Sequence, residues 1–100
     1  MSENEDLKNL RNEMTKITLE IIRLSGKRLV LARKIGEIKA RRGMEVEDPK
    51  VEQELKNKVI ELSREHNIDT DFSLKILNLL IEESKQVQRD VIKEGNKLQV

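Results

Sequence analysis

The sequence contains no cysteine, no tryptophan and no tyrosine, and Phe72 is its only aromatic residue. Without cysteine the chain has no disulfide bonds, no catalytic thiolate and no metal site with thiolate ligands. The single histidine, His66, excludes a metal site built from several histidines. Because aromatic side chains are nearly absent, the core must be built from leucine, isoleucine, valine and methionine.

Long apolar runs and an excess of one charge are also missing. No run approaches the roughly 20 apolar residues that span a bilayer, and residues 1–9 are acidic and polar, unlike a signal peptide. Lys+Arg 20 nearly balances Asp+Glu 19, so neither nucleic acid nor a membrane is expected as a partner. We therefore expect a cytoplasmic protein with a single domain over residues 1–100.

The sequence does contain a long helical pattern of apolar residues. Between Leu7 and Arg42 they recur at steps of three, four or seven, with no proline and two glycines, Gly26 and Gly36. This pattern predicts a first helix over residues 5–42, ended by Gly43. An interior glycine costs only about 1 kcal/mol relative to alanine. The alternative is a turn at Gly26 and its neighbour Ser25, which would allow a monomeric four-helix bundle.

Asp48-Pro49 marks the start of a second helix, predicted over residues 49–65. Aspartate is a favoured N-cap, and proline is tolerated at the first helical position because its missing N–H would be unpaired there. Breaker residues follow at His66-Asn67.

A third helix is predicted over residues 71–94, capped by Thr70 or Asp71 and ending before Gly95. The chain is therefore expected to be all-α, with one long and two shorter helices. The first helix would be about 57 Å long, whereas a compact domain of this size has a radius of gyration of about 13 Å. Two shorter helices cannot cover such a rod, so its apolar stripe predicts an intertwined helical-bundle homodimer.

Cations interrupt the apolar stripe of the first helix. Arg28 and Lys39 are eleven residues apart, so their side chains differ by only about 20° in direction. A half-buried pair of like charges is costly unless an anion lies between them. Arg11 lies about 25 Å from Arg28 along the helix. It reaches the same kind of ligand only in the partner subunit of an antiparallel dimer.

Polar residues also gather on the other helices. Asp48 and Glu52 are four residues apart and face the same way, as are Ser84 and Gln88. Together with the cations they predict a polar pocket inside a helix bundle. Taken singly, each of these residues has a purely structural explanation, as an exposed cation, a helix cap, a solvated carboxylate or a packing residue.

The ordered set resembles the all-helical chorismate mutases over the whole chain. The matching elements are Leu10-Arg11, Arg28, Ile35-Gly36, Lys39, Asp48, Glu52, Ile81-Glu82-Glu83-Ser84 and Gln88. The resemblance implies a dimer spanned by the long first helices, with each active site built mainly from one subunit. It implies conversion of the chorismate dianion to prephenate, in aromatic amino acid biosynthesis by the shikimate pathway, without a metal or cofactor.

The resemblance also implies a role for each candidate residue. Lys39 and Gln88 would be catalytic, because both would donate to the ether oxygen of the substrate. Arg28 and Arg11 of the partner subunit would bind the two carboxylates.

Three further residues would complete the substrate site. Glu52 and Asp48 would hold the ring hydroxyl, and Ser84 would support a carboxylate. The chain departs from the family at Val51, where an arginine commonly precedes the glutamate. Two alternatives stay open: an isochorismate-pyruvate lyase-like activity on the same fold, and a non-catalytic helical dimerisation or binding module.

Overall fold

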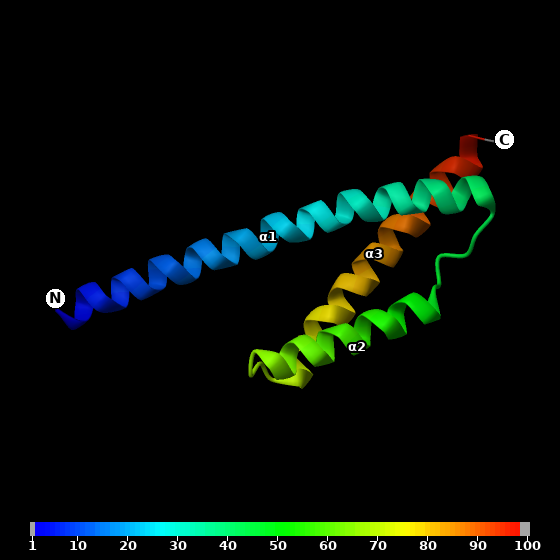
Figure 1. The fold of residues 1–100 in the computed structure, drawn as a ribbon. Helices are drawn as coiled ribbons and strands as arrows, with labels where there is room; N and C mark the ends of the chain where they lie inside the picture. Colours follow the sequence, from blue (N-terminus) through cyan, green and yellow to red (C-terminus); the bar gives the residue numbers. More distant parts are fainter. Residues whose placement is uncertain (1, 99–100) are drawn as a thin grey trace.

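A computed structural model describes residues 2–98 and shows three helices in an extended arrangement (Figure 1). The helices are α1 (Glu3–Arg42), α2 (Pro49–Glu65) and α3 (Thr70–Leu98). The described residues contain no strand. The predicted all-α class with one long and two shorter helices is confirmed.

Helix α1 is continuous over 40 residues. At its start the Ser2 hydroxyl oxygen accepts a hydrogen bond from the Glu5 N–H at 3.2 Å. At its midpoint the Ser25 hydroxyl donates to the Ile21 carbonyl at 2.8 Å, so Ser25 is accommodated inside the helix. The alternative of a turn at this point is wrong. As predicted, Gly43 ends α1 in the left-handed conformation, with φ of 64°.

Helix α2 begins at Pro49, as the sequence predicts. Asp48 occupies the N-cap position, but its side chain makes no capping hydrogen bond. Its carboxylate therefore remains available for another partner. Asn67 follows the end of α2 with φ of 53°, a conformation that asparagine tolerates better than most residues.

Helix α3 differs from its prediction at both ends. An Asp69 carboxylate oxygen accepts from the Phe72 N–H at 3.0 Å, so Asp69 provides the cap instead of Thr70 or Asp71. The helix also continues through Gly95 to Leu98. The expected stop before Gly95 is wrong, because the cost of one interior glycine is too small to end a helix.

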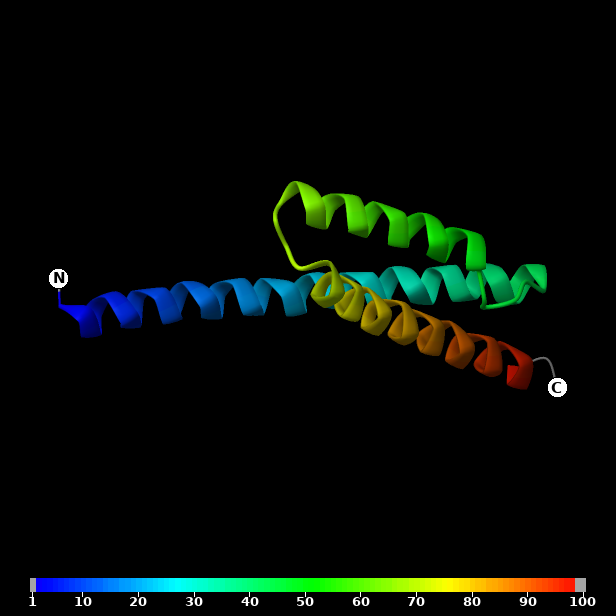
Figure 2. The ribbon, with the colours of Figure 1, turned by 90° about the horizontal axis from the view of Figure 1, so that it is seen from below.

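Helix α3 runs from the end of α2 to the C-terminal part of α1 (Figure 1), and in the view of Figure 2 the α2 helix lies above α1 and the C-terminal part of α3 below it. It packs against both α1 and α2, whereas α1 and α2 nowhere approach within 8 Å between Cα atoms. A glycine permits the contact between α1 and α3. A Cβ atom added at Gly36 would lie 3.0 Å from the Gln88 Cα and 3.3 Å from the Val91 Cβ. Gly36 thus sets how closely α3, and Gln88 with it, approaches α1.

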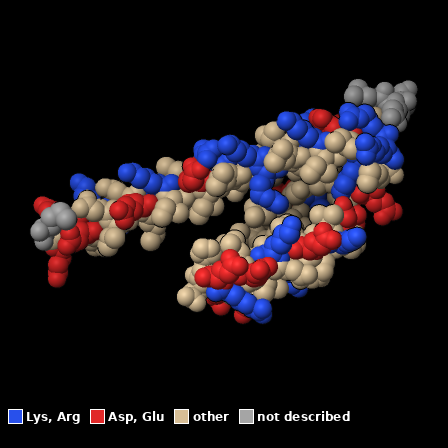
Figure 3. Space-filling model, in the orientation of Figure 1, with Lys and Arg blue, Asp and Glu red and all other residues tan. Residues whose placement is uncertain are grey.

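The molecule is long and has little core. Its extents are 66 × 28 × 14 Å and its radius of gyration is 18.4 Å, against about 13 Å for a compact domain of this size. The N-terminal half of α1 projects alone beyond the other helices (Figures 1 and 3). The buried hydrophobic residues are Ala32, Leu77 and Val91. Within the described part of the chain, no helix has the length and apolarity needed to cross a membrane.

The apolar stripe on the projecting half of α1 is exposed. Its members are each 46–69% exposed, a fraction that leaves most of this apolar face in water: Leu7, Leu10, Met14, Ile17, Ile21 and Leu24. We refer to these six residues as the α1 stripe. A continuous apolar face of this kind is typical of a surface that binds another protein.

The close contact at Gly36 generates a prediction with an internal control. Gly36→Ala should destabilise the fold by about 1–3 kcal/mol, because the methyl group meets the backbone of α3. Gly26→Ala should stabilise it by about 1 kcal/mol through helix propensity, because nothing lies within 4 Å of the added Cβ. Chemical unfolding at one protein concentration measures both. Equal stabilities of the two variants would contradict the close contact.

Candidate active site

A cavity of about 200 Å³ lies between the three helices. All three helices and the connection before α2 contribute to its wall. The lining residues are Arg28, Ile35, Lys39, Val46, Asp48, Val51, Glu52, Leu55, Ile81, Ser84 and Gln88. The structure therefore brings together six of the seven residues singled out from the sequence, on walls that are otherwise aliphatic.

The cavity contains two cations from α1. Lys39 is buried, and its ammonium group donates to the Val46 carbonyl at 2.8 Å. Arg28 is half-buried, and its guanidinium donates to the Leu80 carbonyl at 3.2 Å. An ammonium has three N–H donors and a guanidinium five, so these bonds leave most of both donor sets for a ligand.

Two carboxylates also line the cavity, Glu52 from α2 and Asp48 from the position before it. Asp48 is half-buried, and the Glu52 side chain is 33% exposed. One oxygen of Glu52 lies 3.3 Å from the Lys85 ammonium, an ion pair that anchors this carboxylate to α3. Carboxylates are strong acceptors, so this side of the cavity suits the hydroxyl groups of a ligand.

Ser84 and Gln88 supply neutral polar groups from α3. The Gln88 Nε2 donates to the Ser84 Oγ at 3.1 Å, and Gln88 is 5% exposed. Its Oε1 is the one buried side-chain polar atom without a hydrogen-bond partner among the described residues. A 180° turn of the amide lets the Ser84 hydroxyl donate to Oε1 and places the NH₂ group where Oε1 now lies. This orientation needs an acceptor in the cavity.

Arg11 does not line the cavity. It is exposed on the projecting half of α1, about 25 Å along the helix from Arg28. A site built from one chain alone therefore excludes Arg11.

Sequence reasoning missed an ionic cluster at the edge of the cavity. Lys85 forms ion pairs with Glu47, Glu52 and Glu82 at 3.1–3.3 Å, and Arg89 pairs with Glu47 at 3.0 Å. Hydrogen bonds from Lys85 and Arg89 lower the pKa of Glu47 below its ordinary value of 4.5. The hydrogen bond to Glu47 in turn raises the pKa of Lys85. Both shifts favour the charged forms of Glu47 and Lys85 at neutral pH.

A periodicity signal for Lys85 was present in the sequence. Lys85 lies four residues after Ile81 and three before Gln88, so it belongs to the same helix face as the recognised residues. Its partner Glu47 lies in an irregular connection, where sequence spacing fixes no direction. Only the structure shows that the two meet.

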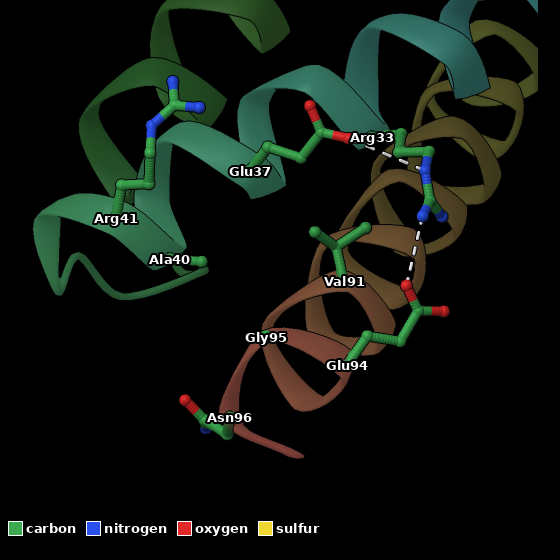
Figure 4. Close-up of a pocket in the computed structure, with 8 residues that line it drawn as sticks. All are labelled: Arg33, Glu37, Ala40, Arg41, Val91, Glu94, Gly95 and Asn96. Atoms are coloured by element: carbon green, nitrogen blue, oxygen red, sulfur yellow. Dashed lines mark hydrogen bonds and ion pairs between the residues drawn. The ribbon is translucent and has the colours of Figure 1, made fainter. Parts of the chain in front are cut away.

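A second hollow, of about 310 Å³, lies between the C-terminal parts of α1 and α3 (Figure 4). Arg33 of α1 reaches across it to the Glu94 carboxylate of α3 at 3.1 Å, and it lies 3.7 Å from the Glu37 carboxylate on its own helix (Figure 4). Its charge is thus balanced locally. None of the residues predicted from the sequence lines this hollow, so the cavity around Lys39 is the candidate active site.

No cluster of three or more histidine, aspartate, glutamate or cysteine side chains in residues 2–98 is arranged to hold a metal ion. The chemistry available in the cavity is that of cations, carboxylates, a hydroxyl and an amide.

The fold is all-α, and the cavity between its helices is lined by two cations and two carboxylates. Residues 10–89 match the family described as chorismate mutase type II. The chain belongs to this family.

Known relatives agree with this assignment. The chain is 32% identical over 90 residues to a chorismate mutase of Methanocaldococcus jannaschii, covering 90% of this chain and 91% of that protein. It is 41% identical over 61 residues to a bifunctional chorismate mutase/prephenate dehydratase of Aquifex aeolicus. A bifunctional protein of the same description from Buchnera aphidicola is 29% identical over 92 residues. The matches cover 61% and 92% of this chain, but only 17% and 24% of the two bifunctional proteins.

Proposed function

We propose that this protein is an isomerase that converts chorismate to prephenate, with residues 1–100 acting as one catalytic domain. The observation that carries the proposal is the cavity. It combines Arg28 and Lys39 with two carboxylates and a buried amide, in a member of the chorismate mutase type II family. The substrate is a dianion with a ring hydroxyl and an ether oxygen. The cations suit its carboxylates, the cavity carboxylates suit the hydroxyl, and the ammonium and amide donors suit the ether oxygen.

The first contribution of the site is orientation. The reaction is a unimolecular [3,3] rearrangement, so the flexible enolpyruvyl arm must be folded over the ring before the new bond forms. Arg28 binds one substrate carboxylate through its planar guanidinium, because two N–H groups of a guanidinium can donate in parallel to the two oxygens of a carboxylate. Ser84 supports a carboxylate from the opposite wall. Fixing both ends of the substrate removes the rotational freedom that slows the reaction in water.

The second contribution is electrostatic. The ether bond breaks ahead of carbon–carbon bond formation, so negative charge grows on the ether oxygen. The buried Lys39 ammonium and the Gln88 NH₂ group, in the orientation that satisfies Oε1, donate to this oxygen. No proton needs to be transferred, which suits a site whose groups only donate or accept hydrogen bonds.

The carboxylates hold the other side of the substrate. One oxygen of Glu52 stays paired with Lys85, and the other accepts a hydrogen bond from the ring hydroxyl. Asp48 accepts a second hydrogen bond at this hydroxyl through its carboxylate, which makes no capping hydrogen bond. Val51 also lines this wall, where the family commonly has arginine. The substrate carboxylates therefore depend more heavily on Arg28, Lys39 and a residue from a second chain.

The exposed α1 stripe is the reason to expect a second chain. We propose an intertwined homodimer in which the stripe of one subunit covers the apolar groove of the other between α1 and α3, lined in part by Leu29, Ile76 and Leu79. Arg28 lies at this groove and also lines the candidate active site. An α1 helix seated in the groove thus passes close to the active site. It places Arg11 of the partner subunit at the second substrate carboxylate.

Removing either proposed ether-oxygen donor should abolish most catalysis. Lys39→Met and Gln88→Met keep the side-chain length but remove the donor, so kcat for chorismate should fall about 10²–10³-fold each. Steady-state loss of chorismate absorbance measures this effect, and thermal unfolding reports on the fold.

Lys34→Met is the matched control, because Lys34 is exposed on the same helix as Lys39. It should retain wild-type kcat. A Lys39→Met or Gln88→Met enzyme with near-wild-type turnover would refute the assigned roles.

A shared active site makes a distinct prediction about mixed dimers. Arg11→Ala and Arg28→Ala homodimers should each be nearly inactive, because every site lacks one carboxylate ligand. Refolding the two variants together should restore activity, since a heterodimer has one site with both arginines intact. Activity of the mixture that stays at the sum of the separate variants would exclude the shared site.

A further inference from the structure

Lys85 lies at the centre of the ionic cluster beside the candidate active site. Its side chain is 14% exposed, and its ammonium lies 3.1 Å from Glu47, 3.3 Å from Glu52 and 3.3 Å from Glu82. An ammonium has three donors, and here each has a carboxylate within reach. Isolated surface ion pairs contribute little, but a largely buried ammonium shared by three carboxylates fixes their relative positions.

The contact with Glu52 acts directly on the candidate active site. Glu52 lines the cavity, whereas Lys85 does not. Because Lys85 holds one carboxylate oxygen, the carboxylate plane and the direction of the other oxygen are restricted. Without this cation, the Glu52 carboxylate would be free to rotate. Its charge would also be unbalanced beside Asp48, which lines the same cavity, and two neighbouring carboxylates repel each other.

The contact with Glu47 acts on the connection that carries Asp48. Glu47 precedes Asp48 in the chain and is held by both Lys85 and Arg89 of α3. The preceding residue, Val46, is held by the Lys39 ammonium of α1. The connection is therefore attached to both neighbouring helices. This matters because α2 has no direct packing contact with α1.

We propose that Lys85 is a positioning residue for the substrate hydroxyl, acting through Glu52 and through the connection that carries Asp48. This inference rests on the proposed chorismate mutase activity. Lys85 does not touch the substrate. It keeps the hydroxyl-binding carboxylates in place and balances part of their charge.

A double-mutant cycle tests the proposal. Lys85→Met should raise KM for chorismate about tenfold, the equivalent of one lost hydrogen bond to a charged group, with a smaller change in kcat. Glu52→Gln should also raise KM. If Lys85 acts in part through Glu52, the rise in KM of the double variant should be smaller than the product of the two single rises. Lys85→Arg, which keeps the charge, should retain most of the wild-type KM.

Lys75→Met is the matched control, because Lys75 is an exposed lysine of the same helix. It should leave KM unchanged. An unchanged KM in Lys85→Met, or effects on KM that multiply in the double variant, would overturn the proposal. Should Lys85→Met fail to fold by circular dichroism, Lys85→Gln replaces it in the cycle. Failure of both to fold would assign Lys85 a structural role and also overturn the proposal.

The failure of this inference is distinguishable from failure of the proposed function. A folded wild-type protein that leaves chorismate unchanged would reject the activity itself. An active wild-type protein whose KM does not depend on Lys85 would reject only the positioning role.

Discussion

The cations Arg28 and Lys39 impose the constraint on which the site depends. They lie on one side of α1 and line the same cavity, and their hydrogen bonds go to the neutral carbonyl oxygens of Leu80 and Val46. Within the described residues neither cation forms an ion pair, whereas Lys85 pairs with three carboxylates. Two like charges that share a partly buried cavity favour an anion bound near them. A dianionic substrate supplies such an anion, and its binding and its conversion then use the same charges.

The length of α1 imposes the second constraint. One half of the helix packs against α3 through Ala32 and Gly36 and carries the cations, whereas the other half projects with its α1 stripe exposed. In the structure this stripe is exposed, with its residues 46–69% accessible. In the proposed homodimer one interaction serves two purposes, because the helix that covers the partner's groove also delivers Arg11. Stability and a complete active site then depend on the same association.

Much of this structure could be predicted from the sequence. Apolar periodicity, Gly43 and Pro49 fixed the helices, because these signals are local. Spacing on a helix also showed that Arg28 and Lys39 share a face. The cap at Asp69 and the passage of α3 through Gly95 were mispredicted, because neighbouring caps compete and an interior glycine costs little.

Contacts between distant segments were beyond prediction from spacing alone. The pairs of Lys85 with Glu47 and Glu52 join residues 38 and 33 positions apart, and Glu47 lies in an irregular connection. The unpartnered Oε1 of Gln88 likewise depends on how α3 packs on Gly36.

The central claim, that the cavity rearranges chorismate, is tested most directly by incubating the purified protein with chorismate and identifying the product. The account predicts prephenate, with no pyruvate released; pyruvate with a hydroxybenzoate, or unchanged chorismate with a folded protein, would contradict it.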